Sequence, residues 1–159
     1  MIQRIQTIWL LLACIAVLAL FLFPYAVFSD SQGLAQALKV TGVVSHVNGA
    51  NQTSTSFLFI LQIIATVVLA MIPLVVIFNY KNRKKQIRLL LINILLAIIF
   101  GIWLYLTSQS SILANGNAVM AQNMGIGALL IPVYIIFLLL AIKGIRSDNK
   151  LVRSADRLR

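Results

Sequence analysis

Four long apolar runs alternate with shorter polar segments along the chain. The runs cover approximately residues 7–28, 56–80, 88–107 and 124–143. Each contains about 20 residues or more, which is enough for a helix to cross a hydrocarbon core about 30 Å thick. The pattern therefore predicts an all-α integral membrane protein with four transmembrane helices.

The polar segment between the second and third spans, residues 81–86, is short. Spans joined by such a loop are expected to pack as antiparallel neighbours, and we predict an antiparallel four-helix bundle. Residues 1–143 would form this transmembrane domain, and residues 144–159 a basic tail. A cleaved signal peptide is the alternative for the first span, but its apolar core is too long and Ala26, Val27 and Phe28 form a poor cleavage site.

Positive charge lies almost entirely on one side of the predicted bundle. Of the 13 Lys and Arg residues, only Lys39 lies in an outer loop, where Asp30 cancels it, so the whole net charge of +10 falls on the other side. Because Lys and Arg in short loops remain in the cytoplasm, both termini are predicted to be cytoplasmic. The basic residues of that side are Arg4, then Lys81, Arg83, Lys84, Lys85 and Arg88, and finally Lys143, Arg146, Lys150, Arg153, Arg157 and Arg159.

The first outer loop, residues 29–55, is long enough to hold structure of its own. Val40, Gly42 and Val44 alternate with polar or small neighbours, and Asn48 with Gly49 is a turn pair typical of hairpins. We therefore expect a short β-hairpin, with an irregular polar loop as the alternative. In the second outer loop, Asn115, Gly116 and Asn117 predict a turn before the fourth helix.

Side chains suited to catalysis are scarce. The chain has three Asp, no Glu, one His and one Cys, and no charged residue falls between the ends of a span. Proton pumps, ion-coupled carriers and intramembrane proteases generally need ionisable groups or metal ligands at membrane depth. His46 has no second ligand at metal-binding spacing, and Cys14 is alone at mid-membrane. We therefore expect no catalytic residue, metal or cofactor.

Polar and small residues form a stripe on each of the second and third spans. The stripes recur every four residues and consist of Gln62, Thr66 and Ala70, and of Asn93, Ala97 and Gly101. A hairpin folded between Lys81 and Asn82 places Gln62 level with Gly101, Thr66 with Ala97, and Ala70 with Asn93. Small residues allow close approach of helices in a bilayer, so we interpret the stripes as a packing seam. A ligand or ion path and a contact with another subunit are the alternatives.

Pro24, Pro73 and Pro132 lie within or at the ends of three spans. A proline in a helix frees a backbone carbonyl, which neighbouring groups must satisfy in a membrane. Tyr134 follows Pro132 near the middle of the fourth span, so its hydroxyl needs a partner in the bundle, in a cavity or on another chain.

The tail combines basic and apolar residues at helical spacing. Ser147 is expected to cap a short helix that carries Leu151, Val152, Ala155 and Leu158 on one face and Lys150, Arg153, Arg157 and Arg159 towards the other. Such a helix commonly lies on anionic lipid. Docking onto an acidic protein surface or onto RNA, such as a ribosome, is the alternative, and charge does not distinguish these. We expect no contact with DNA.

The two ends of the chain also resemble a known family. Residues 1–13, MIQRIQTIWLLLA, the basic central loop between four spans, and residues 151–159, LVRSADRLR, resemble the domain-of-unknown-function 4293 family of Bacteroidota membrane proteins. The resemblance covers the whole chain and implies a bacterial inner-membrane location and four helices. It implies no activity.

These observations favour a non-catalytic accessory or scaffold subunit of a larger membrane complex, with its basic face contacting anionic lipid or a partner protein. The contact residues would be Lys81, Arg83, Lys84, Lys85, Arg88, Lys150, Arg153, Arg157, Arg159, Leu151 and Leu158. A small transporter, channel or lipid-binding module is the main alternative. A membrane enzyme whose cofactor comes from a partner ranks third.

Overall fold

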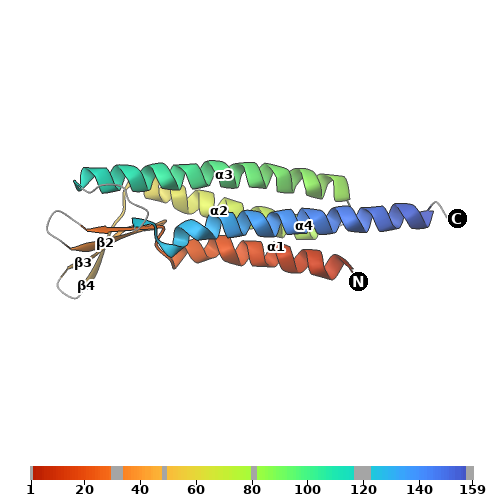
Figure 1. The fold of residues 1–159 in the computed structure, drawn as a ribbon, viewed down its shortest axis with the longest axis horizontal. Coiled ribbons are helices and arrows are strands. Elements are labelled where there is room, and N and C mark those ends of the chain that lie inside the picture. Colours follow the sequence, from red (N-terminus) through yellow and green to blue (C-terminus); the bar gives the residue numbers. More distant parts are fainter. Residues whose placement is uncertain (1, 30–33, 48–49, 80–81, 117–122, 157–159) are drawn as a thin grey trace.

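The computed structural model describes residues 2–29, 34–47, 50–79, 82–116 and 123–156. In this part of the chain, long helices lie side by side, and a small antiparallel sheet covers one end of them (Figure 1). The start of the first helix and the end of the last lie at the opposite end. The helices are α1 (Ile2–Leu18), continued by the 3-10 turn η1 (Ala19–Phe21), then α2 (Phe57–Phe78), α3 (Arg83–Ala114) and α4 (Ile126–Asp156).

Three of these helices are long and apolar enough to cross a membrane. They are Phe57–Phe78, Arg83–Ala114 and the segment Ile126–Asn149 of α4, while the apolar helical stretch Ile5–Phe21 is shorter. Large apolar side chains such as Ile64, Leu95 and Ile99 are exposed on α2 and α3, as expected for surfaces that face lipid. The prediction of a helical membrane protein is therefore confirmed in outline, whereas the crossing by the first helix stays a prediction.

The first predicted span extends too far. Its helix ends at Phe21, and Ala26–Ser29 form strand β1 instead of the last turn of a span. The backbone N–H of Tyr25 donates to Leu38 across the sheet at 2.9 Å, and Ala26 pairs with Leu38. Pro24 cannot continue a helical hydrogen-bond ladder, and in the strand that follows Ala26 and Phe28 are buried whereas Val27 is exposed. Hydrophobicity alone does not distinguish an apolar segment that continues a transmembrane helix from one that forms a strand.

The outer loop and the end of the first predicted span together fold into four strands, whereas a two-stranded hairpin was predicted. Strands β1 (Ala26–Ser29), β2 (Ala35–Lys39), β3 (Gly42–Val47) and β4 (Ala50–Ser54) pair antiparallel in chain order. The predicted hairpin corresponds to β3 and β4, in which Val47 pairs with Ala50. Its turn residues, Asn48 and Gly49, lie outside the described residues.

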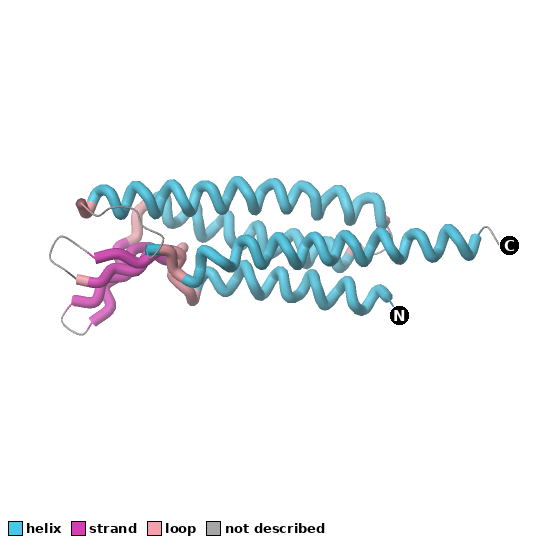
Figure 2. Tube along the Cα trace, viewed as in Figure 1, coloured by secondary structure: helices cyan, strands magenta, loops and turns pink. Residues whose placement is uncertain are grey.

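Both long helices after the central loop exceed their predicted spans. Helix α3 begins at Arg83 and ends at Ala114, and α4 continues without a break from the bundle to Asp156. Ser147 therefore lies inside α4, and the prediction that it caps a separate tail helix is wrong. No proline lies between Lys143 and Asp156 to stop the helix. Figure 2 shows α4 extending beyond the other helices at this end.

Each helix packs against two neighbours, because α1 and α3 both contact α2 and α4. Helices α2 and α3 are antiparallel neighbours, as the short loop predicted. The core between the four helices is built from buried side chains that include Leu10, Val17, Leu69, Leu90, Tyr134 and Leu138.

The start of α4 is fixed to the segment between η1 and β1. The N–H of Gly125 donates to the carbonyl of Tyr25 at 3.0 Å, and the N–H of Gly127 donates to the carbonyl of Pro24 at 2.8 Å. A Cβ on either glycine would collide with the backbone of Pro24. The glycines therefore allow helix and loop backbones to meet here.

Candidate functional site

Buried polar groups form three levels along the bundle, and the level nearest the sheet is centred on Gln62 of α2. The hydroxyl of Tyr25 donates to Gln62 Oε1 at 3.5 Å, and Gln62 Nε2 donates to Thr107 Oγ1 at 3.2 Å. Thr66 donates to the backbone carbonyl of Gln62 at 2.8 Å. Burial raises the pKa of Tyr25 to about 12, and the hydrogen bond to Gln62 acts in the opposite direction. The Tyr25 hydroxyl is therefore even harder to ionise than that of an exposed tyrosine, and it acts as a donor to Gln62.

The central level joins three helices around Tyr134 of α4. Asn93 Nδ2 of α3 donates to the Tyr134 oxygen at 2.7 Å, and the Tyr134 hydroxyl donates to the carbonyl of Leu69 in α2 at 2.8 Å. Leu69 lies four residues before Pro73, so its carbonyl is the one that the missing proline N–H leaves free. Tyr134 satisfies that carbonyl and finds the partner that its own hydroxyl requires.

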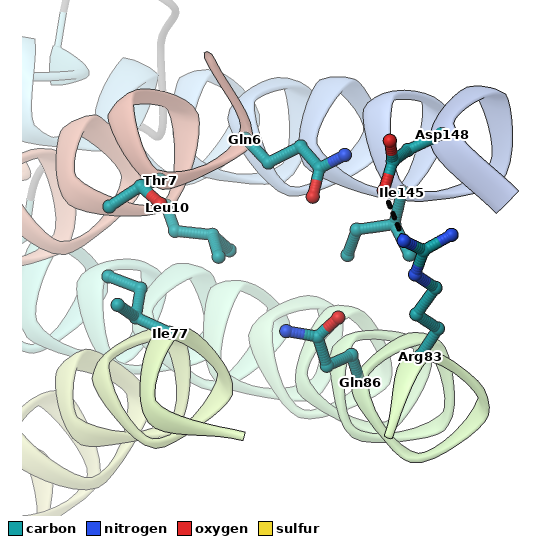
Figure 3. Close-up of a pocket in the computed structure, with 8 residues that line it drawn as sticks. All are labelled: Gln6, Thr7, Leu10, Ile77, Arg83, Gln86, Ile145 and Asp148. Carbon is teal, nitrogen blue, oxygen red and sulfur yellow. Dashed lines mark ion pairs between the residues drawn. The ribbon is translucent and has the colours of Figure 1, made fainter. Parts of the chain in front are cut away.

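The third level is a cavity of about 230 Å³ at the end of the bundle away from the sheet, where α1 begins and α4 leaves the bundle (Figure 3). All four helices line it, with Gln6, Thr7, Leu10, Ile77, Arg83, Gln86, Ile145 and Asp148. Arg83 Nη2 and Asp148 Oδ2 form an ion pair of 2.8 Å between α3 and α4. Gln86 Nε2 donates to the carbonyl of Val76 at 2.9 Å.

Two buried side-chain atoms of the described residues are exceptions to this pattern of satisfied groups, Asn93 Oδ1 in the central level and Nε2 of Gln6 at the cavity. The Gln6 side chain is 8% exposed, and Nε2 has no hydrogen-bond partner among the described residues. Gly144 of α4 makes room for it, since a Cβ there would lie 2.9 Å from Gln6 Cγ. The amides of Gln6 and Gln86 extend into the space between the helices from opposite sides (Figure 3).

The six residues of the predicted seam all lie on the inner side of α2 and α3. Gln62, Thr66, Ala70, Asn93 and Ala97 are buried, and Gly101 is half-buried. The predicted pairing of Gln62 with Gly101 differs from the geometry. Gln62 reaches Thr107 instead, and a Cβ on Gly101 would lie 3.2 Å from Ile131 of α4. Nearer the central loop, Leu69 and Asn93 both form hydrogen bonds with Tyr134. This arrangement is close to the predicted register, which placed Ala70 level with Asn93.

The predicted contact residues fall into three groups. Lys84, Lys85 and Arg88 are exposed near the start of α3, whereas Arg83 is partly buried in its pair with Asp148. Lys150, Leu151 and Arg153 lie in α4, but their side chains are outside the description. Lys81, Arg157, Leu158 and Arg159 lie outside the described residues altogether.

Sequence reasoning missed Gln6, Gln86, Asp148 and Tyr25. Each lies near a span end, where a polar residue on a membrane helix is ordinary. Asp148 carried the clearest signal, because it is one of only three acidic residues and lies among basic ones. Within the described part of the chain, no group of three or more His, Cys, Asp or Glu side chains is placed to hold a metal ion, and Cys14 is buried.

Comparison with known proteins identifies one family. The model of a domain of unknown function, DUF4293, matches residues 2–158, nearly the entire chain. No curated protein and no solved structure matches.

Proposed function

Because the chain belongs to the DUF4293 family, whose description states no activity, we propose a function from its geometry: a non-catalytic accessory or scaffold subunit of a larger membrane protein complex. The observation that carries this proposal is the continuity of α4 from the bundle core to Asp156. Its 31 residues span about 46 Å, more than the hydrocarbon core requires. The tail is therefore presented as a rigid extension.

The base of this extension is held in place by the bundle. Ile145 is buried, and the Arg83–Asp148 ion pair joins α4 to the first turn of α3. A preorganised helix loses less conformational entropy on docking than a flexible tail does, whereas simple attraction to lipid needs no fixed direction. This geometry favours docking of a partner protein onto the tail.

The hydrogen bonds inside the bundle also favour a scaffold function over a transporter or channel function. The Gln62 and Tyr134 levels bond to groups of the bundle itself, joining helices to one another. Buried polar networks rigidify a core where their groups are satisfied, and Asn93 Oδ1 is the one buried side-chain atom of these two levels without a partner among the described residues. A carrier needs groups that release their partners and bind a substrate.

The scaffold is proposed to lie in a bacterial inner membrane with both termini and the basic face in the cytoplasm. Anionic lipid and other membrane proteins are the proposed partners, and RNA or a ribosome is the alternative for the tail. The charge distribution supports this orientation, because the exposed side chains of Lys84, Lys85, Arg88, Lys143 and Arg146 lie at the end away from the sheet.

Breaking the tail helix without changing its charge tests the proposal. Val152→Pro removes a helical hydrogen bond and collides with the carbonyl of Asp148, while every Lys and Arg remains. We expect this variant to lose a stoichiometric partner that copurifies with the wild-type protein from the native host in mild detergent, as measured by mass spectrometry.

Val152→Ala is the matched control and should retain the partner at normal protein abundance. Arg153→Gln with Arg157→Gln should weaken the same contact, because charge sets register and association rate in docking. Equal recovery of all partners with Val152→Pro and Val152→Ala would exclude the tail helix as the docking element.

A further inference from the structure

The cavity near the start of α1 is amphipathic along the bundle axis. Leu10 and Ile77 lie at the end nearer the bundle centre, and Arg83 and Asp148 lie at the other end (Figure 3). At about 230 Å³, the cavity is many times larger than the 10–15 Å³ or so that a single water needs. It has room for a small polar group attached to an apolar one.

The chemistry of the missing group follows from Gln6. Its amide nitrogen is a buried donor without a partner in the described chain, and leaving such a donor unsatisfied is costly. The group that completes the cavity must therefore present an acceptor oxygen. Gln86 does not serve, because its amide oxygen makes no hydrogen bond with Gln6 Nε2.

Two further features favour an anionic oxygen, even though the Asp148 carboxylate also lines the cavity and is paired with Arg83. Arg83 contacts Asp148 through Nη2, and its guanidinium carries five N–H donors, more than that pair uses. Arg83 also lies in the first turn of α3, where the helix dipole favours negative charge. The exposed Lys84, Lys85 and Arg88 add positive potential next to the cavity.

We propose that this cavity binds a phosphate group, held by Gln6 Nε2 and Arg83, and that a membrane phospholipid supplies it. The position of the cavity along the bundle favours a lipid as the source of the phosphate group. The cavity lies where α3 begins its apolar span and α4 leaves the bundle. Leu10 and Ile77 offer an apolar wall to the glycerol end of the headgroup, and Ile145 lies beside Arg83 and Asp148 at the other end. This lipid site is separate from the docking role of the tail.

The test measures lipid binding to the delipidated full-length protein in a neutral detergent. Thermal shift and native mass spectrometry would be followed with three probes: phosphatidylglycerol, diacylglycerol with the same acyl chains, and inorganic phosphate. We expect phosphatidylglycerol to stabilise the protein and to remain bound, and diacylglycerol to do neither.

Gln6→Met keeps the length of the side chain and removes its donor. We expect it to weaken phosphatidylglycerol binding by roughly tenfold or more, the effect of losing one hydrogen bond to a charged group. Gln6→Glu replaces the donor with a carboxylate of the same shape and should weaken binding at least as much. Lys84→Gln with Lys85→Gln removes exposed charge beside the cavity and should weaken binding less than either Gln6 substitution, because neither lysine lines the cavity.

Each contrary result has a definite meaning. Equal stabilisation by diacylglycerol would overturn the phosphate assignment. Full stabilisation by inorganic phosphate alone would overturn the lipid source. Unchanged binding in both Gln6 variants, with loss in the lysine variant, would replace the cavity with a general basic surface. Gln6→Met is also a folding control, because removing an unsatisfied buried donor should not destabilise the protein without lipid.

Discussion

A single tyrosine links two features that the sequence presents separately. Pro73 frees the carbonyl four residues before it, and Tyr134 introduces a hydroxyl into an apolar span. Both needs could be recognised from the sequence. Their pairing could not, because the rotation of α4 that brings Tyr134 to Leu69 depends on packing against α1 and α3.

The role of Tyr134 can be isolated by restoring the missing backbone donor. Tyr134→Phe should lower the free energy of unfolding by about 1 kcal/mol, because Leu69 and Asn93 lose their partner. In a Pro73→Ala background the same change should cost less, since the backbone N–H of the introduced alanine can then bond to the carbonyl of Leu69. Unfolding of all four proteins in detergent or bicelles gives the coupling energy.

Tyr105→Phe serves as the control, because Tyr105 is exposed and should contribute little. If Tyr134→Phe costs the same in the wild-type and Pro73→Ala backgrounds, the hydroxyl is not compensating for the proline.

Among the elements, hydropathy identifies long helices well and short strands poorly. Helix α2 covers nearly the whole second predicted span. Strand β1 is as apolar as the helix before it, so the first run could not be divided by hydropathy. Strand β2, Ala35–Lys39, lacks a clear alternation of apolar and polar residues, and its burial depends on β1 and β3.

The glycines at the start of α4 also escaped prediction, because their importance comes from a segment about 100 residues away. Gly127→Ala would place a Cβ 2.8 Å from the backbone of Pro24, which cannot move as a side chain can. We expect a loss of about 1–3 kcal/mol, typical of overpacking. Thermal unfolding in detergent measures it.

Gly101→Ala is the matched substitution inside the bundle. Its Cβ would meet only the Cγ2 methyl of the Ile131 side chain, at 3.2 Å, and no backbone atom, so a smaller loss is expected. A larger loss at Gly101 than at Gly127 would mean that the contact between α4 and Pro24 is dispensable for stability.

At the scale of the whole molecule, the two ends differ in structure and in charge. The sheet covers one end, and the exposed basic residues of α3 and α4 lie at the other. This asymmetry was predictable, because it depends on where the spans begin and end along the chain. The cavity beside the basic end was not, since its walls come from all four helices and Gln6 becomes buried only when α1 packs against Gly144.

The orientation of this asymmetric molecule can be tested at the two ends of one helix. Asn82 precedes α3 at the basic end, and Asn115 follows it at the end that carries the sheet. In a Cys14→Ser background, Asn115→Cys should react with an impermeant thiol reagent in intact spheroplasts, whereas Asn82→Cys should react only after lysis. The physical reason is that Lys and Arg in short loops are retained in the cytoplasm. Labelling of Asn82→Cys alone would reverse the orientation and place the basic tail, with any partner it docks, outside the cytoplasm.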